Sequence, residues 1–192
     1  MLRIIGGAWR GRRFHAPDSP DVRPTADRVR EAVFNILGQR LEGQRVLDLY
    51  AGAGALGLEA LSRGAEHATF VERTPAVAAV IRQNLERLEG AARATVVVST
   101  AEAYVARRGI GPYDTIFADP PYRHAPGDEL WSAAVERLLV AGGRLVIEHA
   151  ARSSPQLGGL DVELDERRYG DTAVTLVAKP PRSPADLPDP RR

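Results

Sequence analysis

The chain has 192 residues and is 44% apolar, a size and composition typical of one folded domain with its own core. It has no cysteine and no apolar run long enough to cross a bilayer, which excludes disulfides, cysteine-based chemistry and a membrane-spanning helix. The net charge of +1 hides an asymmetry, because residues 1–40 carry eight arginines against four acidic residues.

Residues 1–24 are predicted to form a basic N-terminal arm that contains a small β-hairpin. Two short strand-like runs lie within residues 2–15 and flank Gly6–Gly7 or Gly11. The same stretch has no acid and combines an aromatic residue with arginines, a composition typical of surfaces that contact nucleic-acid phosphates and bases: Trp9, Arg10, Arg12 and Arg13. A solvated, flexible arm is the alternative interpretation.

A helix is predicted from Ala26 to Leu37, with Thr25 as its N-cap. Its apolar residues recur at helical spacing and form one face that packs on a core: Val29, Val33, Phe34 and Leu37. Arg28 and Arg30 are expected to face elsewhere. This helix opens a domain that is predicted to span residues 25–179.

A glycine-rich turn between a strand and a helix predicts a cofactor site. The strand Val46–Tyr50 runs into Gly52-Ala53-Gly54-Ala55-Leu56-Gly57, and a helix over 55–63 follows. Such glycines let the backbone turn tightly and approach a ligand closely. The next strand, Ala68–Val71, ends at Glu72, where a carboxylate can accept hydrogen bonds from both hydroxyls of a ribose.

The glycine pattern by itself does not separate NAD from S-adenosylmethionine. Asp48 favours the second cofactor, because a carboxylate just before the loop suits a cationic or amine-bearing tail. A dinucleotide site would instead favour an uncharged approach to the pyrophosphate.

Helices and strands continue to alternate along the chain. Helices are predicted at 75–89, 101–108 and 128–140, strands at 95–98, 114–118 and 144–147, and a closing hairpin at 160–168 and 172–178. Thr100 lies at a strand end, where it either contacts an adenine edge or caps the following helix. Residues 180–192 are rich in proline, aspartate and arginine and are predicted to be disordered.

The four histidines are scattered along the chain: His15, His67, His124 and His149. They show no metal-ligand spacing, so neither a metal site nor a catalytic histidine is predicted.

The strand 114–118 leads into Asp119-Pro120-Pro121-Tyr122, the stretch that predicts the chemistry. The prolines end the strand and hold Asp119 in an extended conformation at the sheet edge where ligands bind. Asp119 and the Pro120 carbonyl can accept hydrogen bonds from an NH2 group on a planar ring, while Tyr122 stacks on its face.

Two acceptors that hold the amine hydrogens out of the ring plane would give the nitrogen a usable lone pair. A nucleobase amine is therefore activated here by positioning and electrostatics, without a covalent intermediate. A strand that ends in a proline turn with a surface tyrosine is the alternative interpretation.

Together these motifs resemble the RsmD type of Class I methyltransferase, a family that methylates the exocyclic N2 of a guanine in 16S ribosomal RNA. The resemblance rests on five stretches: 4–7 with 10–12, 23–31 with 34–37, 47–52, 56–65 and 119–122. Two positions depart from the family pattern. Ala53 stands where Ser or Thr is usual, and Thr100 stands where related enzymes often carry Asp or Asn.

The resemblance implies a Rossmann-like α/β fold, with a seven-stranded, mostly parallel sheet, helices on both faces and an antiparallel edge. It implies direct methyl transfer from S-adenosylmethionine, with Asp119, Pro120 and Tyr122 as the catalytic residues. It also implies two sets of binding residues: Asp48, Tyr50, Gly52, Gly54, Glu72, Thr100, Ala101 and Asp119 for the cofactor, and Arg10, Arg12, Arg13, Arg23 and Arg28 for RNA phosphates.

The implied partner is 16S rRNA in a partly assembled or complete small ribosomal subunit, bound by a cytoplasmic monomer without membrane contact. The start of the chain also lacks the apolar stretch of a signal peptide. Three other functions stay open at this point: methylation of adenine N6 in DNA or RNA, an NAD-dependent oxidoreductase, and a non-catalytic RNA-binding module.

Overall fold

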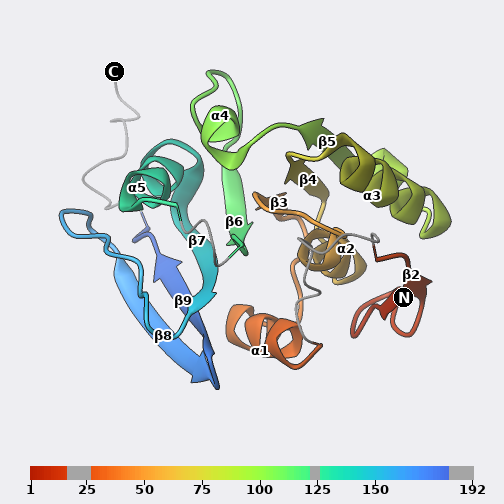
Figure 1. Ribbon diagram of the computed structural model, residues 1–192, viewed down its shortest axis with the longest axis horizontal. Helices are drawn as coiled ribbons and strands as arrows, with labels where there is room; N and C mark the ends of the chain where they lie inside the picture. Colours follow the sequence, from red (N-terminus) through yellow and green to blue (C-terminus); the bar gives the residue numbers. More distant parts are fainter. Residues whose placement is uncertain (17–26, 122–125, 182–192) are drawn as a thin grey trace, which may run out of the picture.

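A central sheet organises the part of the chain that the computed structural model describes, residues 1–16, 27–121 and 126–181 (Figure 1). Its strands are β3 (Arg45–Asp48), β4 (His67–Glu72), β5 (Ala94–Val98), β6 (Tyr113–Ala118), β7 (Leu139–Ala150), β8 (Glu163–Tyr169) and β9 (Thr172–Ala178). The seven strands are ordered β5-β4-β3-β6-β7-β9-β8. The first five are parallel, and β9 pairs antiparallel with β7 and β8, as predicted.

Helices cover both faces of this sheet (Figure 1), namely α1 (Asp27–Leu37), α2 (Ala55–Ser62), α3 (Pro75–Arg87), α4 (Ala101–Val105) and α5 (Asp128–Arg137). Successive strand residues point to opposite faces, so Val46 joins a core with α1, α2 and α3. Its neighbour Leu47 joins a second core with α4 and α5. None of the helices in the described part of the chain is long and apolar enough to cross a bilayer.

The strand order also predicts where a ligand binds. The chain runs outward from β3 through β4 to β5, then returns to place β6 on the other side of β3. The boundary between the neighbouring strands β3 and β6 is therefore the topological switch point. Open α/β sheets bind ligands there, at the carboxyl ends of the strands. Asp48 ends β3 and Asp119 follows β6, so the two carboxylates flank this point.

The predicted N-terminal hairpin is confirmed, because β1 (Leu2–Arg3) pairs antiparallel with β2 (Arg13–Phe14). It is not a solvated arm, since Ile4, Trp9 and Phe14 are buried in the core beside α2 and α3. The prediction that Trp9 contacts nucleic-acid bases is wrong. Its backbone N–H donates to Ser62 Oγ at 2.9 Å, and a guanidinium from η1 (Ala91–Arg93) lies 5.3 Å from its ring centroid. The predicted boundary at residues 24–25 lies outside the described residues.

Arg30 does not face away from the core as predicted. Its side chain is fully buried, its Nε lies 3.8 Å from Glu59 Oε2, and its Nη2 donates to the carbonyl of Arg3 at 2.8 Å. Helical spacing places charged residues on the solvent side of a helix. The prediction fails here because the buried carboxylate of Glu59 on α2 pairs with the Arg30 guanidinium.

The other differences concern element ends. Helix α4 ends at Val105 rather than at 108, and the chain then passes the positive-φ residues Gly109 and Gly111. Helix α5 ends at Arg137 because Leu139 already pairs with Tyr113, so β7 starts earlier than the predicted strand at 144. Lys179 Nζ donates to the carbonyl of Val135 in the last turn of α5 at 2.8 Å and to that of Leu139 in β7 at 2.9 Å, so it gives one of the last helix carbonyls a partner. The predicted tail beyond residue 181 lies outside the described residues.

Candidate cofactor and substrate site

Three carboxylates gather at the carboxyl ends of the adjacent strands β4, β3 and β6. Asp48 is only 2% exposed, and its Oδ2 accepts the Gly57 N–H at 3.1 Å. Burial raises the pKa of Asp48 to about 7, although the Gly57 N–H opposes the rise, and the charges of Asp119 and Glu72 add to it. Asp48 therefore lies close enough to both Asp119 and Glu72 to be repelled by their charges.

The glycine loop is built around these carboxylates. Gly52 and Gly54 have positive φ values of 51° and 82°, which glycine adopts without steric cost. A Cβ on Gly57 would lie 2.3 Å from the Phe70 ring, so glycine is needed for α2 to pack against β4. Glu72 Oε2 accepts the Gly52 N–H at 3.0 Å, and this bond ties the end of β4 to the loop.

This group of carboxylates fits a cationic ligand better than a pyrophosphate. A ligand with a positive centre would relieve the repulsion that Glu72 and Asp119 exert on Asp48, whereas an anionic phosphate would add to the negative charge there. Glu72 Oε1 accepts from the Thr74 N–H at 2.8 Å, and each carboxylate oxygen has a further lone pair for a hydroxyl. S-adenosylmethionine, with its sulfonium, ammonium and ribose groups, matches these requirements.

The remaining predicted cofactor residues lie around α4. Thr100 caps this helix, because its Oγ1 accepts the Ala103 N–H at 3.2 Å, so the capping alternative is confirmed. Ala101 is buried in the first turn. The Tyr50 hydroxyl donates to Glu102 Oε1 at 3.5 Å, and burial raises the pKa of this phenol above its usual value. Their contact with an adenosine stays a prediction.

A cavity of about 250 Å³ opens beside Pro120 and Pro121, in the stretch that is predicted to hold the amine. Pro120, Pro121 and Trp131 line it, together with Ile147 and His149 from the carboxyl end of β7. Asp128 also lines the cavity, and its Oδ1 accepts the Gln156 N–H at 2.9 Å. The cavity has the apolar, partly aromatic walls that suit a planar ring. Tyr122, the predicted stacking residue, lies outside the described residues.

His149 is a functional candidate that the sequence did not reveal. Its ring is nearly buried, with Nδ1 donating to the Ala150 carbonyl at 3.0 Å and Nε2 lying 2.8 Å from Thr175 Oγ1. Contacts at both nitrogens hold the ring in one orientation at the cavity wall. The available signal was its position, two residues beyond the predicted strand 144–147, at the same sheet edge as Asp119.

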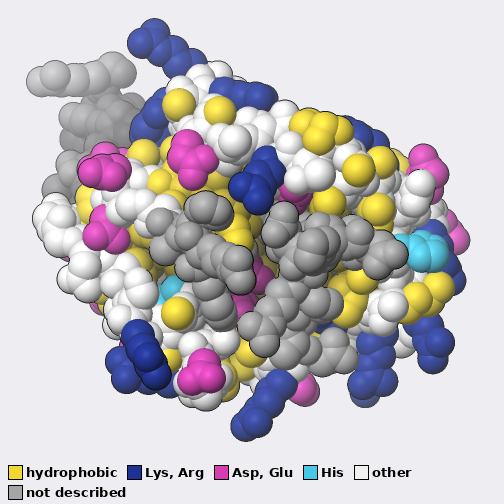
Figure 2. Space-filling model, in the orientation of Figure 1, with side chains coloured by type: hydrophobic (Ala, Val, Ile, Leu, Met, Phe, Trp, Pro, Cys, Tyr) yellow, Lys and Arg dark blue, Asp and Glu magenta, His cyan; other side chains and the backbone are white. Residues whose placement is uncertain are grey.

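The arginines predicted to bind RNA have different environments. Arg10, Arg13 and Arg28 are exposed, and Arg23 lies outside the described residues. Arg12 is tied to the end of α3, where it donates to the carbonyls of residues 87 and 88 at 2.6 and 3.3 Å. Figure 2 shows that on this face most Lys and Arg side chains are spread around the rim rather than gathered in one patch.

Comparison with known proteins shows which family the chain belongs to. The chain matches the family model described as Conserved hypothetical protein 95 over residues 2–178. It is 50% identical over 123 residues to "Ribosomal RNA small subunit methyltransferase D" of Escherichia coli (strain K12), a match that covers 64% of this chain. That match covers 61% of the relative, so the chain spans less than two thirds of its length. It is also 37% identical over 183 residues to "Putative rRNA methyltransferase YlbH" of Bacillus subtilis (strain 168), covering 93% and 99% of the two chains.

Solved structures show the same fold. "Putative methyltransferase yhhF from Escherichia coli" superposes with a TM-score of 0.83 at 37% identity, over 94% of this chain and 99% of that one. "Crystal structure of SMU.776, a putative methyltransferase complexed with SAH" shares the fold at 19% identity with a TM-score of 0.66, over 82% of this chain and 50% of that one. Since the family model covers nearly the whole sequence, the chain belongs to the Conserved hypothetical protein 95 family, which is the RsmD family that its motifs resemble.

Proposed function

We propose that the protein transfers a methyl group from S-adenosylmethionine to the exocyclic N2 of a guanine in 16S rRNA of the small ribosomal subunit. The observation that carries this proposal is the placement of three carboxylates, Asp48, Glu72 and Asp119, at the ends of adjacent strands around the switch point of the sheet. These carboxylates supply negative charge for a sulfonium donor beside Asp119 and the Pro120 carbonyl, the predicted acceptors for an amine. The names of the relatives from Escherichia coli and Bacillus subtilis support rRNA as the substrate.

S-adenosylmethionine supplies an electrophilic methyl group on its sulfonium. Asp48, together with the N-terminal end of α2, holds the amino-acid portion, and Glu72 accepts hydrogen bonds from the ribose hydroxyls. Asp48 carries more negative charge once a cation lies beside it, because an opposite charge favours the ionised carboxylate.

Asp119 and the Pro120 carbonyl accept the two hydrogens of guanine N2 and orient its lone pair toward the methyl carbon. Transfer would form a nitrogen–carbon bond while the carbon–sulfur bond of the donor breaks, and the electron pair of the broken bond would stay on sulfur. Asp119 would accept the proton that the methylated nitrogen releases. The base must leave its stack to reach this site, and its ring enters the cavity beside Pro120 and His149.

The experiment that tests the proposal is methyl transfer from labelled cofactor to small ribosomal subunits that lack the modification. We expect label on N2 of one guanine in 16S rRNA, found by mapping the modified nucleotide. Label on adenine N6 would establish the alternative reaction, since Asp119 and the Pro120 carbonyl can accept hydrogen bonds from the amine of guanine or of adenine. Tight binding of NAD in place of S-adenosylhomocysteine would instead indicate an oxidoreductase. We expect the protein to act as a cytoplasmic monomer.

A further inference from the structure

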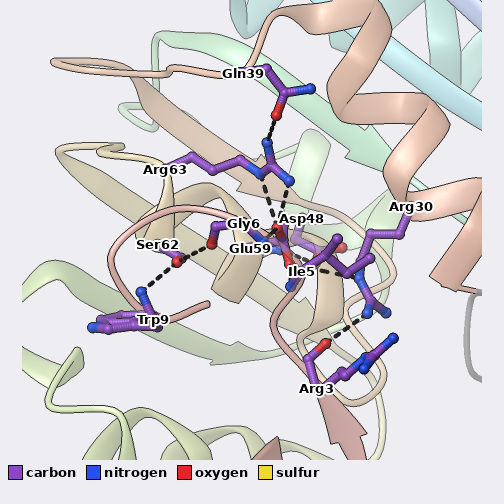
Figure 3. Close-up of polar contacts among 11 residues, drawn as sticks. Arg3, Ile5, Gly6, Trp9, Arg30, Gln39, Asp48, Glu59, Ser62 and Arg63 are labelled. Atoms are coloured by element: carbon purple, nitrogen blue, oxygen red, sulfur yellow. Dashed lines mark hydrogen bonds and ion pairs between the residues drawn. The ribbon is translucent and has the colours of Figure 1, made fainter. Parts of the chain in front are cut away.

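The N-terminal segment is clamped onto the helix that starts at the cofactor loop. Figure 3 shows the Glu59 carboxylate of α2 beside the backbone of Ile5 and Gly6, whose N–H groups donate to it at 2.8 and 2.7 Å. Glu59 is fully buried, and Arg63 Nη2 pairs with it at 2.8 Å. A carboxylate with these partners fixes the backbone that it binds, because each lost bond would leave a buried charged group with one hydrogen-bond partner fewer.

The backbone contact is close as well as charged. A Cβ on Gly7 would lie 1.9 Å from the Ser62 carbonyl oxygen, and Gly7 has a φ of +74°. Ser62 Oγ donates to the Gly6 carbonyl at 2.6 Å and accepts the Trp9 N–H (Figure 3). The segment before the exposed Arg10 thus lies directly on α2, whose N-cap is Gly54 of the cofactor loop.

A second clamp holds the other side of the basic stretch. Asn84 of α3 is fully buried, and its side-chain amide pairs with both backbone groups of His15. The His15 N–H donates to Oδ1 at 2.8 Å, and Nδ2 donates to the His15 carbonyl at 2.9 Å. The same Nδ2 lies 3.3 Å from the carbonyl oxygen of Ala53, which is in the glycine loop. One side chain therefore contacts the basic segment and the cofactor loop together.

We propose that Asn84 is a positioning residue that makes the basic segment between Ile5 and His15 one rigid unit with the cofactor loop. This inference rests on the proposed function, because the partner of the segment is the RNA substrate. Arg10 and Arg13 are exposed on a stretch that is anchored at both ends. Phosphates bound there lie at a fixed distance from the methyl donor, so the flipped base reaches Asp119 without a further search.

The test compares Asn84→Ala with Gln83→Ala, an exposed neighbour on the same helix, in methyl transfer to small ribosomal subunits. Rates are normalised to the number of S-adenosylhomocysteine sites measured by calorimetry, which removes any loss of folded protein. We expect kcat at saturating RNA to fall by about tenfold to a hundredfold in Asn84→Ala, the range expected for a misplaced substrate. We expect Gln83→Ala to stay within twofold of wild type.

A second measurement uses the wild-type protein and needs no RNA. S-adenosylhomocysteine should slow hydrogen exchange at the His15 amide at least threefold more than at the Arg167 amide of the β8–β9 hairpin. This excess should vanish in Asn84→Ala. Equal slowing at the two amides would overturn the inference, and so would an Asn84→Ala variant with the kcat of Gln83→Ala. If wild type methylates no rRNA, the proposed function fails, and the exchange result alone decides whether the two segments are linked.

Discussion

The buried carboxyl of Asp48 should make the stability of the protein depend on pH. Its pKa is 3.8 in an unfolded chain and about 7 in the folded protein, so the folded state holds this proton more tightly. The unfolding free energy should therefore fall as pH rises from about 4 to about 7, and the loss is complete above the folded pKa. A difference of about three pH units corresponds to about 4 kcal/mol at pH 8.

Asp48→Asn removes this titration while keeping an acceptor for the Gly57 N–H. The variant should gain stability over wild type at pH 8, by at most about 4 kcal/mol, and gain little at pH 4. The upper limit will not be reached, because the new amide hydrogens face the Tyr50 N–H that the carboxylate now accepts. The same change should weaken S-adenosylmethionine binding at pH 8, since the site loses a negative charge.

The assay is chemical denaturation of both proteins without cofactor at pH 4 and pH 8, followed by calorimetry with the cofactor. Asp114→Asn serves as the control. Asp114 accepts a hydrogen bond of 2.8 Å from the Arg45 N–H, and this contact does not belong to the site. An Asp48→Asn variant whose stability relative to wild type is the same at both pH values would refute the reasoning. So would unchanged cofactor affinity at pH 8.

Three further substitutions probe other parts of the site. Asp119→Ala should abolish methyl transfer and leave S-adenosylhomocysteine affinity within a few fold, and calorimetry showing a loss of affinity as large as the loss of rate would contradict its role. Glu72→Ala should weaken cofactor binding by about 1–3 kcal/mol, because the glycine loop and the ribose lose a charged acceptor; an unchanged dissociation constant would count against it. Arg10→Ala with Arg13→Ala should reduce the salt dependence of RNA binding by about 1.5 in logarithmic slope. Arg167→Ala is its control, and an identical slope would exclude the segment from phosphate contact.

These arginines are tested by substitution because deletion of residues 1–15 would not isolate RNA binding. Deletion would also remove Ile4, Trp9 and Phe14 from the core and take away the two backbone N–H groups that donate to Glu59. Such a protein would lose stability as well as phosphate contacts, so its RNA affinity would be uninterpretable.

Much of the site follows from local sequence. The glycines that need positive φ, the carboxylate that ends the second strand and the prolines that end β6 each act over a few neighbouring residues. Alternation of strands with helices then predicts a parallel sheet, and parallel strands bring their carboxyl ends to one edge. The residue pattern alone therefore suffices to predict that Asp48, Glu72 and Asp119 lie together.

Tertiary structure alone decided which polar residues serve the fold. Arg30, Arg12 and Asn84 look like surface residues in sequence, yet they bind Glu59, the end of α3 and the backbone of His15. His149 enters the cavity only because β7 pairs beside β6 and meets Thr175 of β9. Each of these partners is distant along the chain. Local patterns cannot predict such contacts, because a buried charge or amide is stable only where the folded chain brings its partner to it.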